Sequence, residues 1–248
     1  MKKISLLFIV LFTINTSYLK AQLIADQGYS NRRTTSSLFV LDEYIKRQEK
    51  GVNYKDTKSY KGTPYNNPSF LPGNIYESNK LLATDVALRY NAIADEIEVK
   101  ETLATSDDKA KVLSKSLDVF VKINKDIFIF APYQGGVEDG GYFQVLFEGE
   151  NYNLYKKLKK KFTPEKKATT SITNDLPATF KDSPVYYIVT KEGKYYELPE
   201  PKNKKLKVFG NKQNEIKKYV KENKLNLKEE KDLLRVVRYF DNFKNAKS

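Results

Sequence analysis

The sequence contains no histidine, no cysteine and no tryptophan among its 248 residues. Without histidine there is no Ser-His-Asp or Cys-His nucleophilic system, no imidazole ligand for zinc and no general base that titrates near neutrality. Without cysteine there is no disulfide and no diacylated lipoprotein anchor. Tryptophan, the largest aromatic platform for a sugar ring, is also missing, although tyrosine can replace it. An enzyme built from this chain would need carboxylate pairs, a desolvated lysine or tyrosine.

Beyond the first residues, the sequence has no apolar stretch that approaches membrane-spanning length. At the N-terminus, two lysines precede the apolar run Ile4–Ile14, and Ala21-Gln22 offers a small residue at a cleavage point. This order is typical of a secretory signal peptide over residues 1–21, and the apolar run is too short to cross a ~30 Å hydrocarbon layer as a helix. We therefore predict an exported protein, periplasmic or secreted, that is not a lipoprotein and has no transmembrane segment in its mature chain.

The formal net charge is +13, and it is unevenly distributed. Residues 22–150 carry 16 basic and 19 acidic side chains, whereas residues 151–248 carry 25 basic and 12 acidic ones. A basic region of this kind suits an anionic partner such as membrane phospholipid, an acidic polysaccharide or nucleic acid. The alternative interpretation is an ordinary lysine-rich solvated surface.

The densest basic run provides the candidate contact residues for an anionic surface. They are Lys156, Lys157, Lys159, Lys160 and Lys161. Aromatic residues lie among them, which favours binding, but lysines on a strand near a sheet edge also protect against edge-to-edge pairing. The partner is not identified by the sequence. An anionic envelope surface or an acidic polysaccharide is compatible with an exported protein, and nucleic acid is not expected there.

Alternating apolar and polar residues predict half-buried strands from Val86 onward, with a bulge or tight turn near Ala92–Asp95. Three hairpins follow from the same pattern and from the turn residues between the runs. They join Val119–Ile123 to Ile127–Phe130, Tyr142–Phe147 to Tyr152–Leu158, and Val185–Val189 to Tyr195–Leu198. Sequential hairpins at this spacing indicate an antiparallel meander.

Three segments carry weaker patterns. Residues 36–49 could form a helix, although Ser37–Leu41 could equally form a short strand. Residues 54–76 contain several prolines, which exclude a regular helix and a central strand, so we expect an extended segment pinned by Tyr60, Tyr65, Phe70 and Tyr76. These rings either bury against the sheet or line a groove. Residues 163–182 are polar and contain two prolines, which predicts an exposed loop.

Helical spacing returns in the last forty residues. Ile216, Tyr219 and Val220 fall on one face of Asn211–Glu222, and a second apolar stripe runs through Lys228–Phe243. Asn226 is suitably placed to cap the second helix. Lysines on the outside of two short helices are also seen in DNA-binding motifs, but export argues against that role.

Together these patterns predict an α+β fold, an antiparallel β meander (an open sheet or a partly closed barrel) followed by a C-terminal helical hairpin. The expected organisation is a signal peptide at 1–21, a lead-in with a possible helix at 22–59, an antiparallel β domain at 60–200 and a basic helical pair packed on it at 201–248.

Two segments have the most specific sequence motifs, Tyr60–Tyr76 (YKGTPYNNPSFLPGNIY) and Leu88–Glu98 (LRYNAIADEIE). With the strand at Gly141–Leu146 and the closing lysine-rich helices, the chain resembles uncharacterised secreted proteins common in Bacteroidetes-type bacteria. The resemblance covers most of residues 60–243. It implies an exported, periplasmic protein and carries over no catalytic or binding residue.

Two acidic groups are candidates for chemistry. The first is the cluster Arg89, Asp95, Glu96 and Glu98, in which alternation would place Glu96 and Glu98 on one face of a strand, roughly 6.6 Å apart. That separation could suit the carboxylate pair of a glycosidase. The alternative is that both carboxylates form ordinary ion pairs with lysines on a neighbouring strand. The segment 135–141 could bend around a cation through Glu138 and Asp139, or serve as a flexible connection. We assign no catalytic residue, cofactor or metal. The expected function is a non-enzymatic binding or envelope-associated module, and the alternative is a carboxylate-dependent hydrolase acting on glycans.

Overall fold

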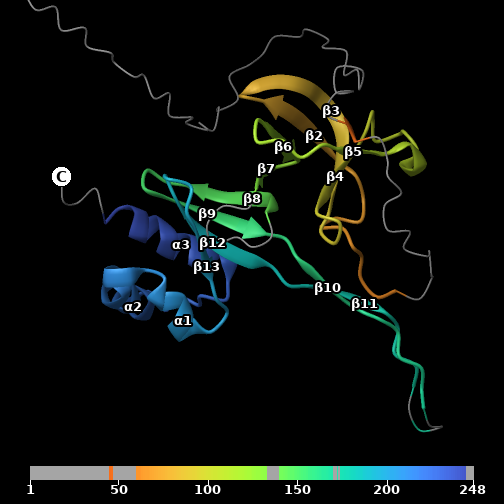
Figure 1. Ribbon diagram of the computed structural model, residues 1–248. Helices are drawn as coiled ribbons and strands as arrows, with labels where there is room; N and C mark the ends of the chain where they lie inside the picture. Colours follow the sequence, from red (N-terminus) through yellow and green to blue (C-terminus); the bar gives the residue numbers. More distant parts are fainter. Residues whose placement is uncertain (1–44, 47–59, 133–139, 170–171, 173, 244–248) are drawn as a thin grey trace, which may run out of the picture. The chain divides into compact units, whose positions relative to one another are not determined.

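The computed structural model describes residues 45–46, 60–132, 140–169, 172 and 174–243 (Figure 1). The strands are β1 (Ile45–Lys46), β2 (Leu71–Glu77), β3 (Lys80–Asn91), β4 (Glu96–Lys100), β5 (Lys111–Leu113), β6 (Val119–Ile123), β7 (Asp126–Ala131), β8 (Gly141–Glu148), β9 (Tyr152–Lys157), β10 (Lys160–Thr163), β11 (Thr179–Asp182), β12 (Val185–Thr190) and β13 (Tyr195–Leu198). The α-helices are α1 (Lys202–Lys207), α2 (Gln213–Glu222) and α3 (Glu230–Asp241). The predicted signal peptide lies outside the described residues.

Eleven strands form one antiparallel sheet in the order β1-β5-β4-β3-β2-β6-β7-β8-β9-β12-β13. The sheet is open, since β1 and β13 lie at its two edges among the described strands. The helices follow the last strand in sequence. The prediction of an α+β fold with an antiparallel meander and a C-terminal helical part is therefore confirmed, in its open-sheet form.

The three predicted hairpins are present as β6–β7, β8–β9 and β12–β13. The predicted turn at Ala92–Asp95 joins β3 to β4. Both Asp95 (φ 54°) and Asn124, in the β6–β7 turn (φ 53°), have left-handed backbone conformations. Asp and Asn tolerate this region better than other side chains, which explains why these turns could be located from the sequence.

Apolar side chains gather in three clusters. One lies among β2 to β7 and includes Ile75, Leu88 and Val121, all fully buried. The second lies between the helices and one face of β9, β12 and β13, where Leu154 and Ile188 contribute from the strands. The third is rich in aromatic rings and extends from β7 and β8 to β9, β12 and β13. On β9 and β12 its members, Tyr155 and Tyr187, are next to Leu154 and Ile188 in sequence, so they point to the other face of the sheet.

The helical part contains three α-helices where the sequence predicted two. The apolar stripes of α2 and α3 are buried, as predicted, and Tyr219 of α2 stacks on Tyr239 of α3 with ring centroids 3.8 Å apart. Helix α1 was missed because its six residues include only one apolar side chain, Leu206, which is buried. In the described residues, no helix has the length and hydrophobicity needed to cross a membrane.

The prediction that prolines keep residues 54–76 out of a central strand was wrong for β2. This strand contains Pro72 and pairs with both β3 and β6. Its ladder with β6 begins at Gly73, so Pro72 lies just outside that ladder and its missing N–H is not needed there. The carbonyl of Pro72 still accepts a hydrogen bond from the backbone N–H of Asn124 (2.8 Å).

The predicted loop at residues 163–182 is partly a β-ladder. Strands β10 and β11 pair with each other and form a separate two-stranded sheet, called the arm below together with the described residues between them. A further bridge joins Lys166 to Leu176. The described residues of this segment between β10 and Leu176 are exposed, as predicted, but backbone pairing made the irregular-loop prediction wrong.

Two local helix predictions also need correction. Within the possible helix at 36–49, Ile45–Lys46 form strand β1, which pairs with β5, and the rest lies outside the described residues. Asn226 does not cap α3, whose N-cap position is Glu229. The side chain of Asn226 instead accepts a hydrogen bond from the backbone N–H of Lys228, in the turn before the helix. Asp232 accepts a hydrogen bond from the backbone N–H of Asn226 and so orders this turn from inside the helix.

Candidate anionic-surface contact

The five lysines singled out in the sequence do not form one exposed strip. Lys156 and Lys157 end β9, Lys159 lies in the connection, and Lys160 and Lys161 begin β10. Strand β9 pairs with β8 on one side and β12 on the other, so the prediction of an edge strand was wrong. The strand that covers β9 begins at residue 185, too far along the chain for the local pattern to reveal.

Lys157 is the most buried member of the run, with 5% of its side chain exposed. Its ammonium lies 3.0 Å from the Asp95 carboxylate and donates to the carbonyl of Gly140 (3.0 Å). Burial lowers the pKa of Lys157 from its ordinary value, and the neighbouring Asp95 acts in the opposite direction. Lys157 therefore forms a buried ion pair, and its ammonium could contact an anionic surface only by leaving Asp95.

Asp95 is the centre of this buried polar cluster. Besides Lys157, its carboxylate contacts the ammonium of Lys115 (3.1 Å) and accepts hydrogen bonds from the hydroxyl of Tyr90 (2.7 Å) and the backbone N–H of Tyr142 (3.1 Å). Burial raises the pKa of Tyr90, and the Asp95 charge adds to the effect, so the hydroxyl stays protonated and donates. The cluster links the β3–β4 turn to β8 and β9.

Lys156 and Lys160 are also paired with carboxylates. The ammonium of Lys156 lies 2.7 Å from Glu230 of α3, and that of Lys160 lies 2.8 Å from Asp182 of β11. Together with Lys159, these lysines line a hollow of about 220 Å³ beside the base of the arm. Ligand pockets usually start at ~300 Å³, so we assign no small molecule to this hollow. Among the five lysines, Lys161 alone is exposed.

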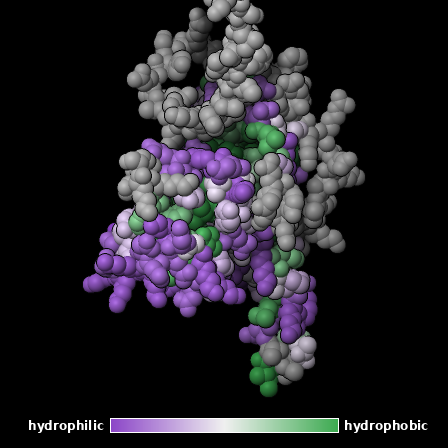
Figure 2. All heavy atoms as spheres, turned by 60° about the vertical axis from the view of Figure 1, so that its left-hand side comes forward, coloured by the Kyte–Doolittle hydropathy of each residue, from purple (hydrophilic) through white to green (hydrophobic). Residues whose placement is uncertain are grey.

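The helices carry the larger exposed basic surface, which Figure 2 shows as a continuous group of hydrophilic residues. Eleven basic side chains on α1–α3 and their connections are exposed: Lys202, Lys204, Lys207, Lys217, Lys218, Lys221, Lys224, Lys228, Lys231, Arg235 and Arg238. In the same segment the acidic residues Glu222 and Glu229 are exposed, and the side chains of Glu215 and Glu230 are 44% and 40% exposed. We call these eleven residues the basic helical surface.

Burial of the apolar stripes explains why these charges face outward. Ile216 and Val220 of α2 and Val236 and Val237 of α3 are at most 2% exposed, so the sides of these helices that remain accessible carry the charged residues. Weak pairs within the helices involve Lys218 with Glu222 (3.8 Å) and Arg235 with Asp232 (3.7 Å). Exposed pairs of this kind contribute little to stability, so they do not account for the excess of lysine.

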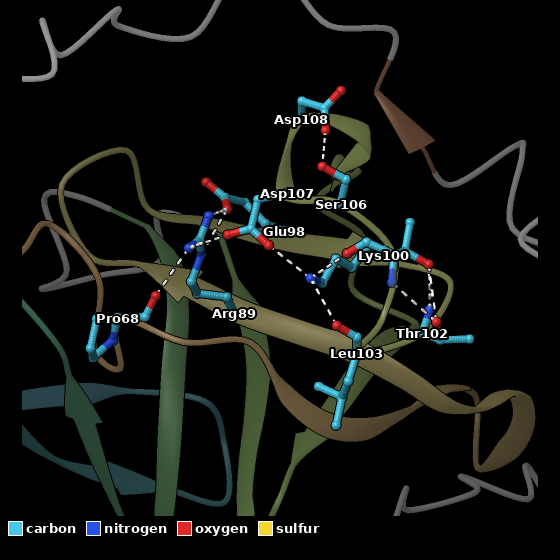
Figure 3. A network of polar contacts seen from close by, with 10 residues as sticks. Pro68, Arg89, Glu98, Lys100, Thr102, Leu103, Ser106, Asp107 and Asp108 are labelled. Atoms are coloured by element: carbon cyan, nitrogen blue, oxygen red, sulfur yellow. Dashed lines mark hydrogen bonds and ion pairs between the residues drawn. The ribbon is translucent and has the colours of Figure 1, made fainter.

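Two members of the acidic cluster of the sequence analysis, Arg89 and Glu98, form part of a second polar network (Figure 3). Arg89 of β3 lies opposite Glu98 of β4, and its guanidinium donates from both Nε and Nη2 to one carboxylate oxygen of Glu98 (3.0 and 2.7 Å). The guanidinium is stacked on the rings of Tyr65 and Phe70, 3.7 and 4.1 Å from their centroids. These rings were expected either to bury or to line a groove, and here they cover Arg89.

The same network continues through Asp107, whose carboxylate contacts Arg89 (3.4 Å) and Lys100 (2.7 Å). The hydrogen bond from Lys100 holds the pKa of Asp107 below its usual value. Lys100 also donates to the carbonyls of Leu103 and Thr105, which fixes the segment between β4 and β5. The network therefore has a structural explanation that requires no substrate.

A pair of catalytic carboxylates at Glu96 and Glu98 is not supported by this geometry. Glu98 is held by Arg89, and neither the hollow beside the arm nor a second one beside Arg89 and Tyr90 is lined by Glu96 or Glu98. Across the described residues, no group of three acidic side chains is arranged to hold a metal ion. The candidate cation ligands Glu138 and Asp139 lie outside the described residues.

The chain shows no significant match to a known protein family, to a curated protein or to a solved structure.

Two features of functional interest could not be recognised in the sequence. The partner of Lys157 is Asp95, 62 positions earlier, and no local pattern connects them. The apolar residues of the arm, Ile172 and Leu176, lie in a polar segment that we interpreted as a loop. The single isoleucine, Ile172, in this polar segment was the one sequence signal that could have indicated an exposed apolar site there.

Proposed function

We propose that this chain is an exported, non-enzymatic binding module that attaches to an anionic surface through the basic helical surface. The observation that carries the proposal is the ratio of eleven exposed basic side chains to four exposed acidic ones on α1–α3 and their connections. Each lysine or arginine near an anionic membrane surface contributes about 1 kcal/mol of attraction. Several such residues on one packed helical unit provide an affinity that single surface lysines cannot.

Packing supports this assignment. The lysines of the helices project from elements whose apolar sides are fixed against the sheet, so their positions relative to one another are held by the core. Many of them also have no counter-charge within the described residues; Lys217, Lys221, Lys224 and Lys228 form no ion pair there. An external anionic partner would supply the missing counter-charge, and its effect would fall over about 8 Å at physiological salt.

Export is the second part of the proposal, and it rests on the leader at residues 1–21. We expect a tagged chain, fractionated from an expressing Gram-negative cell, to be recovered in the periplasm or medium as a mature form shortened at its N-terminus. N-terminal sequencing of that form should begin near Gln22. Recovery of the full-length chain in the cytoplasm would contradict this part.

Neutralising part of the basic helical surface should weaken attachment. We expect the variant with Lys217, Lys221, Lys224 and Lys228 changed to Gln to bind vesicles containing phosphatidylglycerol at least tenfold more weakly than the unchanged mature chain. Four contributions of about 1 kcal/mol would each be lost, and they are only partly additive. Cosedimentation over a range of lipid concentrations measures the change.

A matched control is available in the first part of the sheet. Lys80, Lys109, Lys122 and Lys125 are equally exposed, and changing them to Gln removes the same net charge. We expect that control to alter vesicle binding less than threefold. Equal losses for the two variants would show that net charge alone drives association and that the helices form no specific contact.

A further inference from the structure

The arm is anchored firmly at its base. Phe162 of β10 and Phe180 of β11 lie directly opposite each other, with ring centroids 4.9 Å apart, and Tyr60 packs on both rings. Lys61 bonds to the arm through its own backbone, accepting from Phe180 (2.8 Å) and donating to Ala178 (2.8 Å). The arm is therefore a β-hairpin inserted between β9 and β12, and packing on Tyr60 and pairing with Lys61 hold its base in place.

Further from the base, the arm exposes apolar side chains that a protein in water would normally bury. Ile172 is 93% exposed and Leu176 is 61% exposed, and Phe162, at the base, is itself 42% exposed. These are three of the seven large apolar side chains that are exposed in the described part of the chain. Figure 2 shows hydrophobic residues at the free end of the arm, beyond a stretch of hydrophilic ones. Ile172 and Leu176 are called the arm tip below.

The strands behind the arm tip carry an unfavourable arrangement of charge. Lys161 of β10 lies directly opposite Lys181 of β11, and both are exposed. Like charges at directly opposite positions destabilise a two-stranded ladder. Neither lysine forms an ion pair with a described residue, whereas Lys160, on the other face of β10, is paired with Asp182. A phosphate group located between Lys161 and Lys181 would remove this repulsion.

We propose that the arm inserts its tip into the interfacial region of an anionic lipid bilayer, with Lys161 and Lys181 contacting lipid phosphates. The end exposes two aliphatic side chains, the carboxylate between them (Asp175) lies 3.9 Å from the ammonium of Lys167, and further lysines follow. This order matches the depth profile of a bilayer, in which acyl chains lie beneath a layer of negative headgroups. An acidic polysaccharide would explain the lysines but gives no reason for an exposed isoleucine. The inference rests on the proposed function and names the lipid surface as its partner.

The absence of tryptophan permits a direct test. Ile172→Trp introduces a single indole at a position that is 93% exposed, so the fold should tolerate it. With vesicles containing phosphatidylglycerol, we expect its emission to shift to shorter wavelength and to be quenched by brominated acyl chains. The matched control is Leu117→Trp, at another exposed leucine (66%) outside the arm, which should keep the emission of an indole in water.

Loss of the apolar tip should weaken attachment without affecting the fold. The variant with Ile172 and Leu176 changed to Asn is expected to bind anionic vesicles about tenfold more weakly, since partial burial of two aliphatic side chains is lost. The corresponding change Leu117→Asn should leave binding unchanged.

The outcomes separate the two proposals. If the Ile172→Trp chain sediments with anionic vesicles while its indole remains fully solvated, the arm proposal is wrong and the proposed function stands. If the chain binds neither anionic nor neutral vesicles, both are wrong. Sedimentation with anionic vesicles together with quenching at position 172, but not at position 117, supports both.

Discussion

Replacing Asp95 with Asn should lower the free energy of unfolding by about 3 kcal/mol, because it removes the one carboxylate that compensates two lysine ammonium groups. The Lys157 side chain is 5% exposed and that of Lys115 is 30% exposed, and both lie about 3 Å from Asp95. Asn is the informative substitution, since it tolerates the left-handed backbone at this position (φ 54°) and preserves the side-chain shape. The change therefore isolates the charge.

The expected loss of unfolding free energy is large because the Lys157 ammonium is buried. The pKa of Lys157 is already lowered by burial, and Asp95 is the neighbour that opposes this effect. In the Asp95→Asn variant the chain must either hold an uncompensated buried ammonium or release its proton, and each alternative costs free energy. Equilibrium unfolding in urea, followed by circular dichroism, measures the difference.

Two companion variants distinguish this explanation from general damage. Adding Lys157→Met to Asp95→Asn should recover part of the lost stability, since the buried charge is then absent. Asp182→Asn removes the partner of Lys160, but the Asp182 side chain is 78% exposed, so we expect a loss below about 1 kcal/mol. A loss of less than 0.5 kcal/mol, roughly the value for an exposed pair, in the Asp95→Asn variant itself would contradict our account of the cluster.

A second large effect is expected at Asp241, the last residue of α3. Asp241→Ala should lower the free energy of unfolding by about 3 kcal/mol, because three backbone N–H groups lose their acceptor. The Asp241 carboxylate accepts from the backbone N–H groups of Glu150 (2.9 Å), Asn151 (2.7 Å) and Tyr152 (2.7 Å), in the β8–β9 turn. Asp241 is 4% exposed, so water cannot easily replace it.

The position of Asp241 indicates that its role is to dock the helix. An acidic residue at the C-terminal end of a helix is disfavoured by the helix dipole, so local helix stability does not explain it. The β8–β9 turn packs closely against the Asp241 carboxylate. A Cβ atom added at Gly149 would lie 2.3 Å from a carboxylate oxygen of Asp241. Asp241 therefore fixes the end of α3, and with it the basic helical surface, to the sheet.

A control for Asp241 is Glu222, the last residue of α2. It is exposed and forms only a 3.8 Å pair with Lys218 one turn earlier. We expect Glu222→Ala to change stability by less than about 0.5 kcal/mol. Similar effects at the two positions would show that the hydrogen bonds to the β8–β9 turn do not hold the helix in place.

The hairpins could be predicted because their signals are local. In β6–β7, short apolar runs lie on both sides of Asn124, whose side chain suits a left-handed turn, and all of this is contained in about twelve residues. The buried stripes of α2 and α3 were equally visible, because their spacing follows the period of a helix.

Non-local pairing explains most of what was missed. Strand β9 was taken for an edge strand because β12, which covers it, is separated from it by the whole arm. The arm was interpreted as a loop because strands of polar residues produce no apolar alternation. Pro72 argued against a central strand, and only the point where its ladder with β6 begins shows why a proline is tolerated there.

The five candidate contact lysines were chosen from a local run, and the structure gives most of them carboxylate partners. The density of Lys156–Lys161 in the sequence attracted attention, yet burial depends on partners such as Asp95 and Glu230 that lie far away in the chain. The lysines of the helices are more widely spaced, and only the packing of the helices on the sheet shows that they share an exposed surface.

The most direct test of the central claim is the salt dependence of vesicle binding by the chain from Gln22 onward, the mature form that we propose. Attraction between the basic helical surface and lipid phosphates is screened as ionic strength rises, since the Debye length shortens from about 30 Å at 0.01 M to about 8 Å at 0.15 M. We predict strong binding to phosphatidylglycerol vesicles at low salt, a steep fall as salt is added, and no binding to neutral phosphatidylcholine vesicles. Equal binding to both lipids, or none to the anionic vesicles at low salt, would contradict the account.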